Sequence, residues 1–96
     1  MKKMLTPLIL TLGVMHAGSS LACDLPSKPE IPEGTGNTEA QMLEAKAAVD
    51  TYLAAGNSYL ECAGSDRAYN RMVKNMENVS LKFNLALRRY KKAQKA

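Results

Sequence analysis

The strongest constraint on the fold is a pair of heptad patterns that follow one another along the chain. In each pattern, apolar or small residues recur at alternating gaps of three and four positions. The first comprises Met42, Ala45, Val49, Tyr52, Gly56, Tyr59 and Ala63. The second comprises Tyr69, Met72, Met76, Val79, Phe83, Ala86, Tyr90 and Ala93. This spacing is typical of helices that pack against each other along one apolar stripe.

Residues that start and stop helices flank the first pattern. Thr38 and Gln41 form a T-x-x-Q capping box, which predicts a helix start. Gly64 is a natural helix stop, and Ser65 or Asp66 is a natural cap for the next helix. The sequence therefore predicts two helices at about 38–63 and 66–94, within a helical region of residues 38–96.

The two patterns match if the chain folds back at the predicted turn. Facing core positions then have residue numbers that add to 131 or 132 throughout, with Tyr52 facing Val79 and Gly56 facing Met76. Several layers set a small residue against a large one, as interdigitating side chains require. We therefore expect an all-α fold, an antiparallel two-helix hairpin resembling a coiled coil.

The charges divide between the two halves of this hairpin. Residues 23–66 hold two basic and eight acidic residues, whereas residues 67–96 hold nine basic and one acidic residue. In the same register, Glu44 would face Arg88 and Asp50 would face Lys82. The expectation is that the acidic helix neutralises the basic one without an external partner.

The first 22 residues have the layout of a secretory signal peptide. Two lysines follow Met1, residues 4–15 are an apolar run, and small residues stand at Ser20 and Ala22. The run is shorter than the ~20 residues that span a bilayer. We therefore predict that residues 1–22 are removed and that the mature protein is periplasmic or secreted.

Two cysteines remain after that cut, Cys23 and Cys62. Paired thiols in exported chains form disulfides, so a Cys23–Cys62 bond is the leading expectation. A cysteine directly after the cut also fits a lipoprotein anchored to the membrane at Cys23. Ser20 and Leu21 fit that signal poorly, because it prefers a large aliphatic residue at the position of Ser20 and a small one next. Lipidation of Cys23 stays the alternative.

The segment 23–37 is rich in proline. Pro26, Pro29 and Pro32 recur at every third residue, the repeat of a polyproline II helix. At about 3.1 Å per residue the segment can run back along the first helix, which rises about 1.5 Å per residue. We expect an extended segment docked by the disulfide, with Leu25, Ile31, Leu53 and Leu60 forming a cluster at its side. A PxxP ligand for an SH3-like domain is the weaker interpretation.

Several short segments carry a resemblance to known proteins. They are Cys23, Pro29–Gly34, Glu39–Met42, Tyr59–Cys62, Tyr69–Asn70 and Phe83–Asn84. In these segments, nearly the whole mature chain resembles a loose group of small, uncharacterised exported two-cysteine helical proteins of Gram-negative bacteria. The I-P-x-G turn and the Y-L-x-C helix end are its most specific parts. The resemblance implies a periplasmic location and a two-cysteine hairpin, and it implies no activity.

The mature chain offers no pattern for catalysis. The one histidine, His16, lies in the predicted signal peptide, so imidazole acid/base and triad chemistry are excluded. Met72 and Met76 are thioethers of the kind that bind Cu(I), but both fall on the core pattern and are expected in the core. We predict no catalytic residue, no cofactor, no metal site and no enzymatic activity.

Two surfaces remain as candidate sites. Leu81 and Leu85 lie off the core pattern and form a candidate patch for an envelope protein or a second copy. The second surface is the basic helix end, a candidate site for anionic lipid or lipopolysaccharide, with nucleic acid not expected outside the cytoplasm. Its residues are Arg88, Arg89, Lys91, Lys92 and Lys95. The sequence predicts a structural or interaction module of the bacterial envelope, and an anion- or membrane-binding protein is the alternative.

Overall fold

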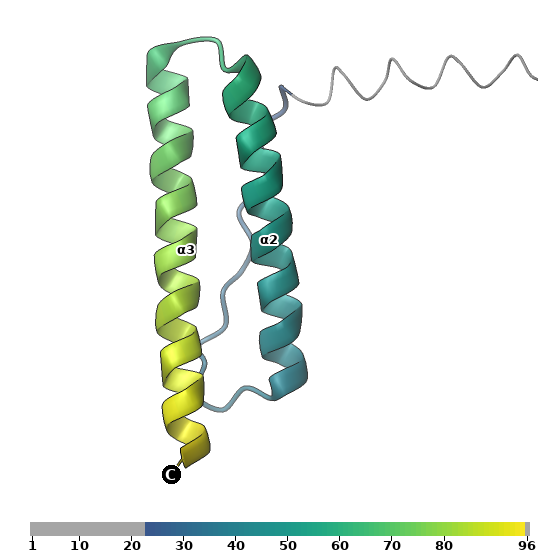
Figure 1. Cartoon of the computed structure of the whole chain (residues 1–96), viewed down its shortest axis with the longest axis vertical. Coiled ribbons are helices and arrows are strands. Elements are labelled where there is room, and N and C mark those ends of the chain that lie inside the picture. Colours follow the sequence, from purple (N-terminus) through teal and green to yellow (C-terminus); the bar gives the residue numbers. More distant parts are fainter. Residues whose placement is uncertain (1–22, 96) are drawn as a thin grey trace, which may run out of the picture.

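The structure is a computed structural model that describes residues 23–95, so the predicted signal peptide lies outside the described residues. Two helices, α2 (Glu39–Cys62) and α3 (Asp66–Lys95), follow one another along the chain. They pack side by side as a hairpin (Figure 1). The predicted all-helical hairpin is therefore confirmed, and each helix begins and ends within one residue of the predicted bounds.

The start of α2 follows from the side chain of Thr38. Its hydroxyl accepts a hydrogen bond from the Gln41 backbone N–H at 3.1 Å, and the Gln41 side-chain oxygen accepts one from the Thr38 backbone N–H at 2.9 Å. Both halves of the predicted capping box are thus present. Because the first N–H groups of a helix lack partners within it, these bonds stabilise the start of α2.

A short turn joins the two helices. The Ser65 hydroxyl accepts a hydrogen bond from the Ala68 backbone N–H at 3.1 Å, and Asp66 is the first helical residue of α3. Of the two predicted candidates for this cap, Ser65 is therefore the one that acts. The turn places the start of α3 beside the end of α2 and so sets the antiparallel register.

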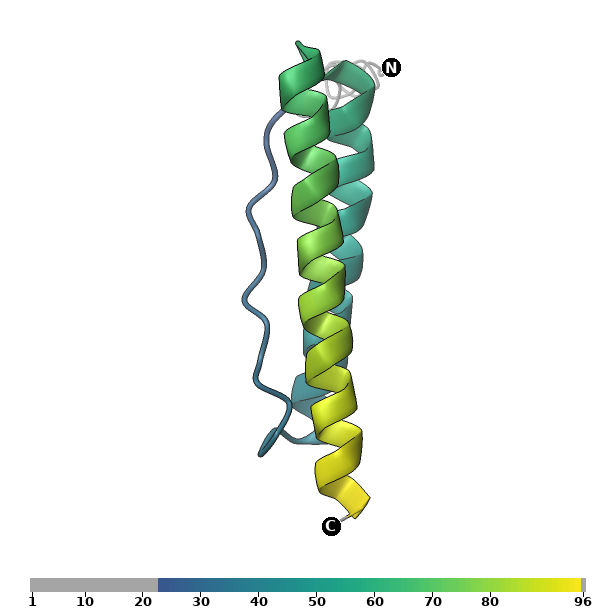
Figure 2. The ribbon, with the colours of Figure 1, turned by 90° about the vertical axis from the view of Figure 1, so that its left-hand side faces the viewer.

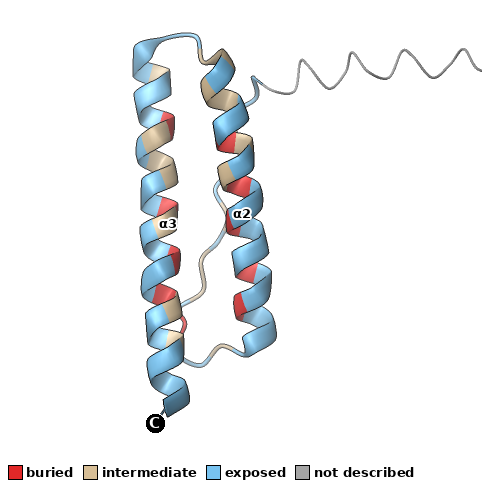
Figure 3. Cartoon of the chain, in the orientation of Figure 1, coloured by how far each residue is buried: buried red, intermediate tan, exposed pale blue. Residues whose placement is uncertain are grey.

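The core lies between the two helices, where the buried residues face each other (Figure 3). Its buried members are Met42, Ala45, Val49, Tyr52, Met72, Val79, Phe83 and Ala86. The two ends of the predicted core pattern differ, because Tyr69 is 44% exposed and Ala93 is also exposed. Near Tyr69 the facing helix has already ended, at Cys62. Ala93 faces the start of α2, so neither residue has a full partner layer.

Gly56 lets the helices approach closely. A Cβ atom added there would lie 2.8 Å from the sulfur of Met76 and 3.1 Å from the terminal methyl of Met72. Such separations are shorter than van der Waals contact, so a larger residue would push these methionines away. The predicted pairing of Gly56 with Met76 is thus confirmed by their close contact.

A disulfide joins Cys23 to Cys62, as predicted, with a Cα–Cα distance of 5.6 Å that lies in the usual range for disulfides. From Cys23 the segment 23–37 runs beside the hairpin toward the start of α2 (Figure 2). Ile31 is half-buried and packs against the core, and Gly34 is buried. The segment 23–37 therefore lies against one side of the hairpin.

Candidate functional site

The charged side chains do not pair between the helices as the sequence suggested. Within residues 23–95 the one ion pair joins Lys46 to Asp50 at 2.9 Å, inside α2, and both side chains are 61% exposed. Asp50 thus meets a cation one turn away on its own helix instead of Lys82, and Glu44 does not reach Arg88. Exposed ion pairs gain little free energy because water screens them and the long side chains lose entropy.

The basic helix end is therefore open to solvent and to ligands. Its predicted anion-binding residues lie near the C-terminal end of α3, and all of them are exposed: Arg88, Arg89, Lys91, Lys92 and Lys95. None forms an ion pair within the described part of the chain. Arg89 lines a groove beside the proline-rich segment, whereas Arg88 and Lys92 lie on the outer side of the helix by their spacing.

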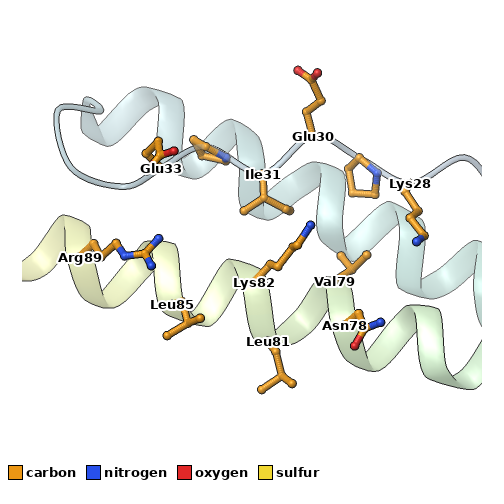
Figure 4. Close-up of a pocket in the computed structure, with 12 residues that line it drawn as sticks. Lys28, Glu30, Ile31, Glu33, Asn78, Val79, Leu81, Lys82, Leu85 and Arg89 are labelled. Atoms are coloured by element: carbon orange, nitrogen blue, oxygen red, sulfur yellow. The ribbon is translucent and has the colours of Figure 1, made fainter.

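The predicted partner patch is strongly exposed. The Leu81 side chain is 62% exposed and that of Leu85 is 43% exposed. In Figure 4 both point away from the proline-rich segment, whereas Ile31 points from that segment toward α3. Leu81 and Leu85 thus lie at the edge of the groove between the segment and α3, with their side chains turned outward.

The proline-rich segment and α3 form a groove on one side of the core (Figure 4). Its walls include Pro29 and Ile31 from the segment and Val79 and Lys82 from α3. On the neighbouring side, the segment lies near small residues of α2 such as Ala48 and Ala55. The small side chains of α2 leave room for the extended backbone.

A second groove opens between α2 and α3, and no residue of the proline-rich segment lines it. We call it the open groove; it is lined by Leu53, Asn57, Leu60, Val73, Met76, Glu77, Ser80 and Leu81. The expected cluster of Leu25, Ile31, Leu53 and Leu60 is therefore wrong. Leu25 is 62% exposed, and the segment takes the side of α2 with small residues and leaves the leucine side uncovered.

The heptad positions contain a signal for this groove that a search for core residues misses. Leu53 and Leu60 each follow a core tyrosine directly, and Val73 follows Met72. One step along a helix turns by about 100°, so these side chains flank the core on one side. Apolar residues on a flank indicate a surface that extends beyond the two-helix core.

No three residues of the types His, Cys, Asp and Glu gather within residues 23–95 to hold a metal ion. Met72 is buried in the core, and Met76 packs against it. Burial of the Tyr52 side chain raises its pKa above 10.0, which favours the neutral phenol.

These features define the class of the protein: a small helical hairpin closed by a disulfide, with one open apolar groove and a basic outer helix. No protein-family model, curated protein or solved structure matches the chain. Within residues 23–95, both helices fall short of the length of apolar sequence that crossing a membrane requires.

Proposed function

We propose that this chain is an exported, non-catalytic helical hairpin that acts as a protein-interaction module in the bacterial envelope. The observation that carries the proposal is the open groove, where half-buried apolar side chains of both helices lie uncovered. The signal-peptide pattern, the disulfide and the resemblance to small periplasmic proteins support the location. The docked proline-rich segment covers the other side, so the open groove is the accessible edge of the core.

A second copy of the chain is the occupant we propose for the open groove. The flanks around it carry the charges of Lys46, Asp50, Glu77 and Lys91 by heptad position, which cancel. Two such faces can meet without like-charge repulsion, whereas the outer face of α3 is strongly basic. Pairing would convert two thin hairpins into a four-helix bundle with a central core.

The association is tested by sedimentation of the oxidised protein, secreted from its full coding sequence. We expect a dimer, and we expect Ser80→Lys to give monomers because it places a charge in the groove without removing an apolar contact. Asn78→Lys is the matched control, since Asn78 lies two residues away and lines the groove on the proline side. A wild-type protein that is monomeric at every concentration contradicts this proposal.

The second candidate function is binding of an anionic surface, lipid or lipopolysaccharide, by the basic end of α3. The absence of ion pairs at Arg88 and Lys92 within the described chain favours it. A lipid on Cys23 would add a membrane anchor, but a sulfur held in the disulfide cannot carry one. The test is retention of the protein on anionic vesicles, which Arg88→Gln with Lys92→Gln should weaken. Unchanged retention would rule out the basic end.

A further inference from the structure

We infer that the whole outer face of α3, and not just its C-terminal end, is a docking surface for an anionic phospholipid bilayer. This inference rests on the second candidate function, and its surface shares one residue, Leu81, with the open groove. It places α3 flat on the membrane surface, with the hairpin and its disulfide standing on the side away from the lipid.

The surface is a row of side chains directly opposite the core positions of α3, at alternating gaps of four and three residues. We call it the basic stripe; it consists of Arg67, Arg71, Lys74, Asn78, Leu81, Leu85, Arg88, Lys92 and Lys95. All nine residues are exposed. Six are cations, none is a carboxylate, and none has an ion-pair partner within residues 23–95. The row therefore carries unneutralised positive charge at both ends, on either side of a central uncharged stretch.

Two leucines occupy the middle of this strip. Leu81 and Leu85 are one turn apart, and cations lie on both sides of them along the helix. Helices that lie in a membrane interface combine apolar side chains, which enter the headgroup region, with Lys and Arg, which reach the phosphates. An exposed leucine side chain is unfavourable in water, and its transfer into the headgroup region lowers the free energy.

The shape of the stripe favours a bilayer over a small soluble anion. From Arg67 to Lys95 the helix spans about 42 Å, and none of the six stripe cations lines the groove beside the proline-rich segment or the open groove beside α2. The groove beside Leu85 mixes Glu30 and Glu33 with the cations Lys28, Lys82 and Arg89, so its charges largely cancel and it offers no concentrated site for a small anion. A long, exposed strip matches the many phosphate charges of a flat surface.

The experiment measures binding to vesicles of phosphatidylglycerol and phosphatidylcholine in equal parts, using the oxidised protein secreted from its full coding sequence. Arg71→Gln with Lys74→Gln removes two cations that lie about 21 to 26 Å from Arg88 along the helix. We expect binding to fall about 30-fold, since each cation near an anionic surface contributes roughly fivefold. Lys28→Gln with Lys46→Gln removes the same charge outside the stripe and should leave binding nearly unchanged.

A fluorescent reporter locates the leucines independently. The chain contains no tryptophan, so Leu81→Trp gives a single signal that should shift to the blue on these vesicles and not on phosphatidylcholine alone. Leu43→Trp is the matched control, because Leu43 is 60% exposed and lies on α2. Its emission should stay constant.

The outcomes separate this inference from the function on which it rests. If only Arg88→Gln with Lys92→Gln weakens binding, the basic end acts alone and the stripe is overturned. If the wild-type protein does not bind the vesicles, both the docking stripe and the second candidate function are overturned. Binding to soluble heparin without binding to vesicles would assign the stripe to an acidic macromolecule and would also overturn the bilayer.

Discussion

Gly34 is the residue at which the turn before α2 comes closest to α3. Its φ of +96° lies in the left-handed region, and a Cβ there would overlap the carbonyl oxygen of Ala86. Its N–H donates to the Asn37 side-chain oxygen at 2.7 Å. Glycine is therefore required twice, by backbone conformation and by space.

Gly34→Ala should lower the free energy of unfolding by about 3 kcal/mol, from backbone strain and overlap with α3. Gly36→Ala is the matched control, because Gly36 has a φ of +86° but nothing within 4 Å of an added Cβ. It should cost about 1 kcal/mol, from strain alone. Urea unfolding measures both, and equal losses would mean that the segment does not press against α3.

Tyr52 makes stability depend on pH in the alkaline range. Burial raises its pKa in the folded state above 10.0, so the unfolded chain ionises first as the pH rises. The stabilisation is fully present below pH 10.0 and is lost as the pH passes through the folded pKa. Tyr52→Phe should reduce the fall in unfolding free energy across this range. An identical fall in the variant would show that Tyr52 does not contribute.

At the scale of the element, α2 depends on its cap. Thr38→Ala removes the hydroxyl that accepts the Gln41 N–H and should cost about 1 kcal/mol of unfolding free energy. Thr35→Ala is the control, since Thr35 is exposed and lies outside the capping box. Chemical denaturation followed by circular dichroism compares them. A loss at Thr35 as large as that at Thr38 would argue against the cap.

At the scale of the whole molecule, the disulfide closes a long covalent loop that joins the start of the proline-rich segment to the end of α2. Cys23 and Cys62 are 39 positions apart, and a cross-link over such a loop contributes about 4 kcal/mol by restricting the unfolded chain. Reduction should therefore lower the unfolding free energy by up to that amount while the helices persist in circular dichroism. Reductant should leave the unfolding free energy of the variant Cys23→Ser with Cys62→Ser unchanged. If reductant also left that of the wild-type protein unchanged, this role of the disulfide would be contradicted.

The sequence by itself determined the hairpin and its register, and it favoured the disulfide over lipidation at Cys23. Heptad spacing specifies which side of each helix is apolar, and the Thr38 cap and the Gly64 turn specify where the helices begin and end. The cap and turn signals involve only neighbouring residues. The register needs only the comparison of two heptad patterns in the same chain. For that reason the spacing alone predicts that Gly56 faces Met76.

Only the tertiary structure decided which flank of the hairpin is covered and which charges pair. The proline-rich segment lies along the small residues of α2, near Ala48, and so leaves Leu53 uncovered. Asp50 meets Lys46 on its own helix instead of Lys82. Both outcomes depend on the space beside a helix and the reach of exposed side chains, which spacing along one chain does not specify.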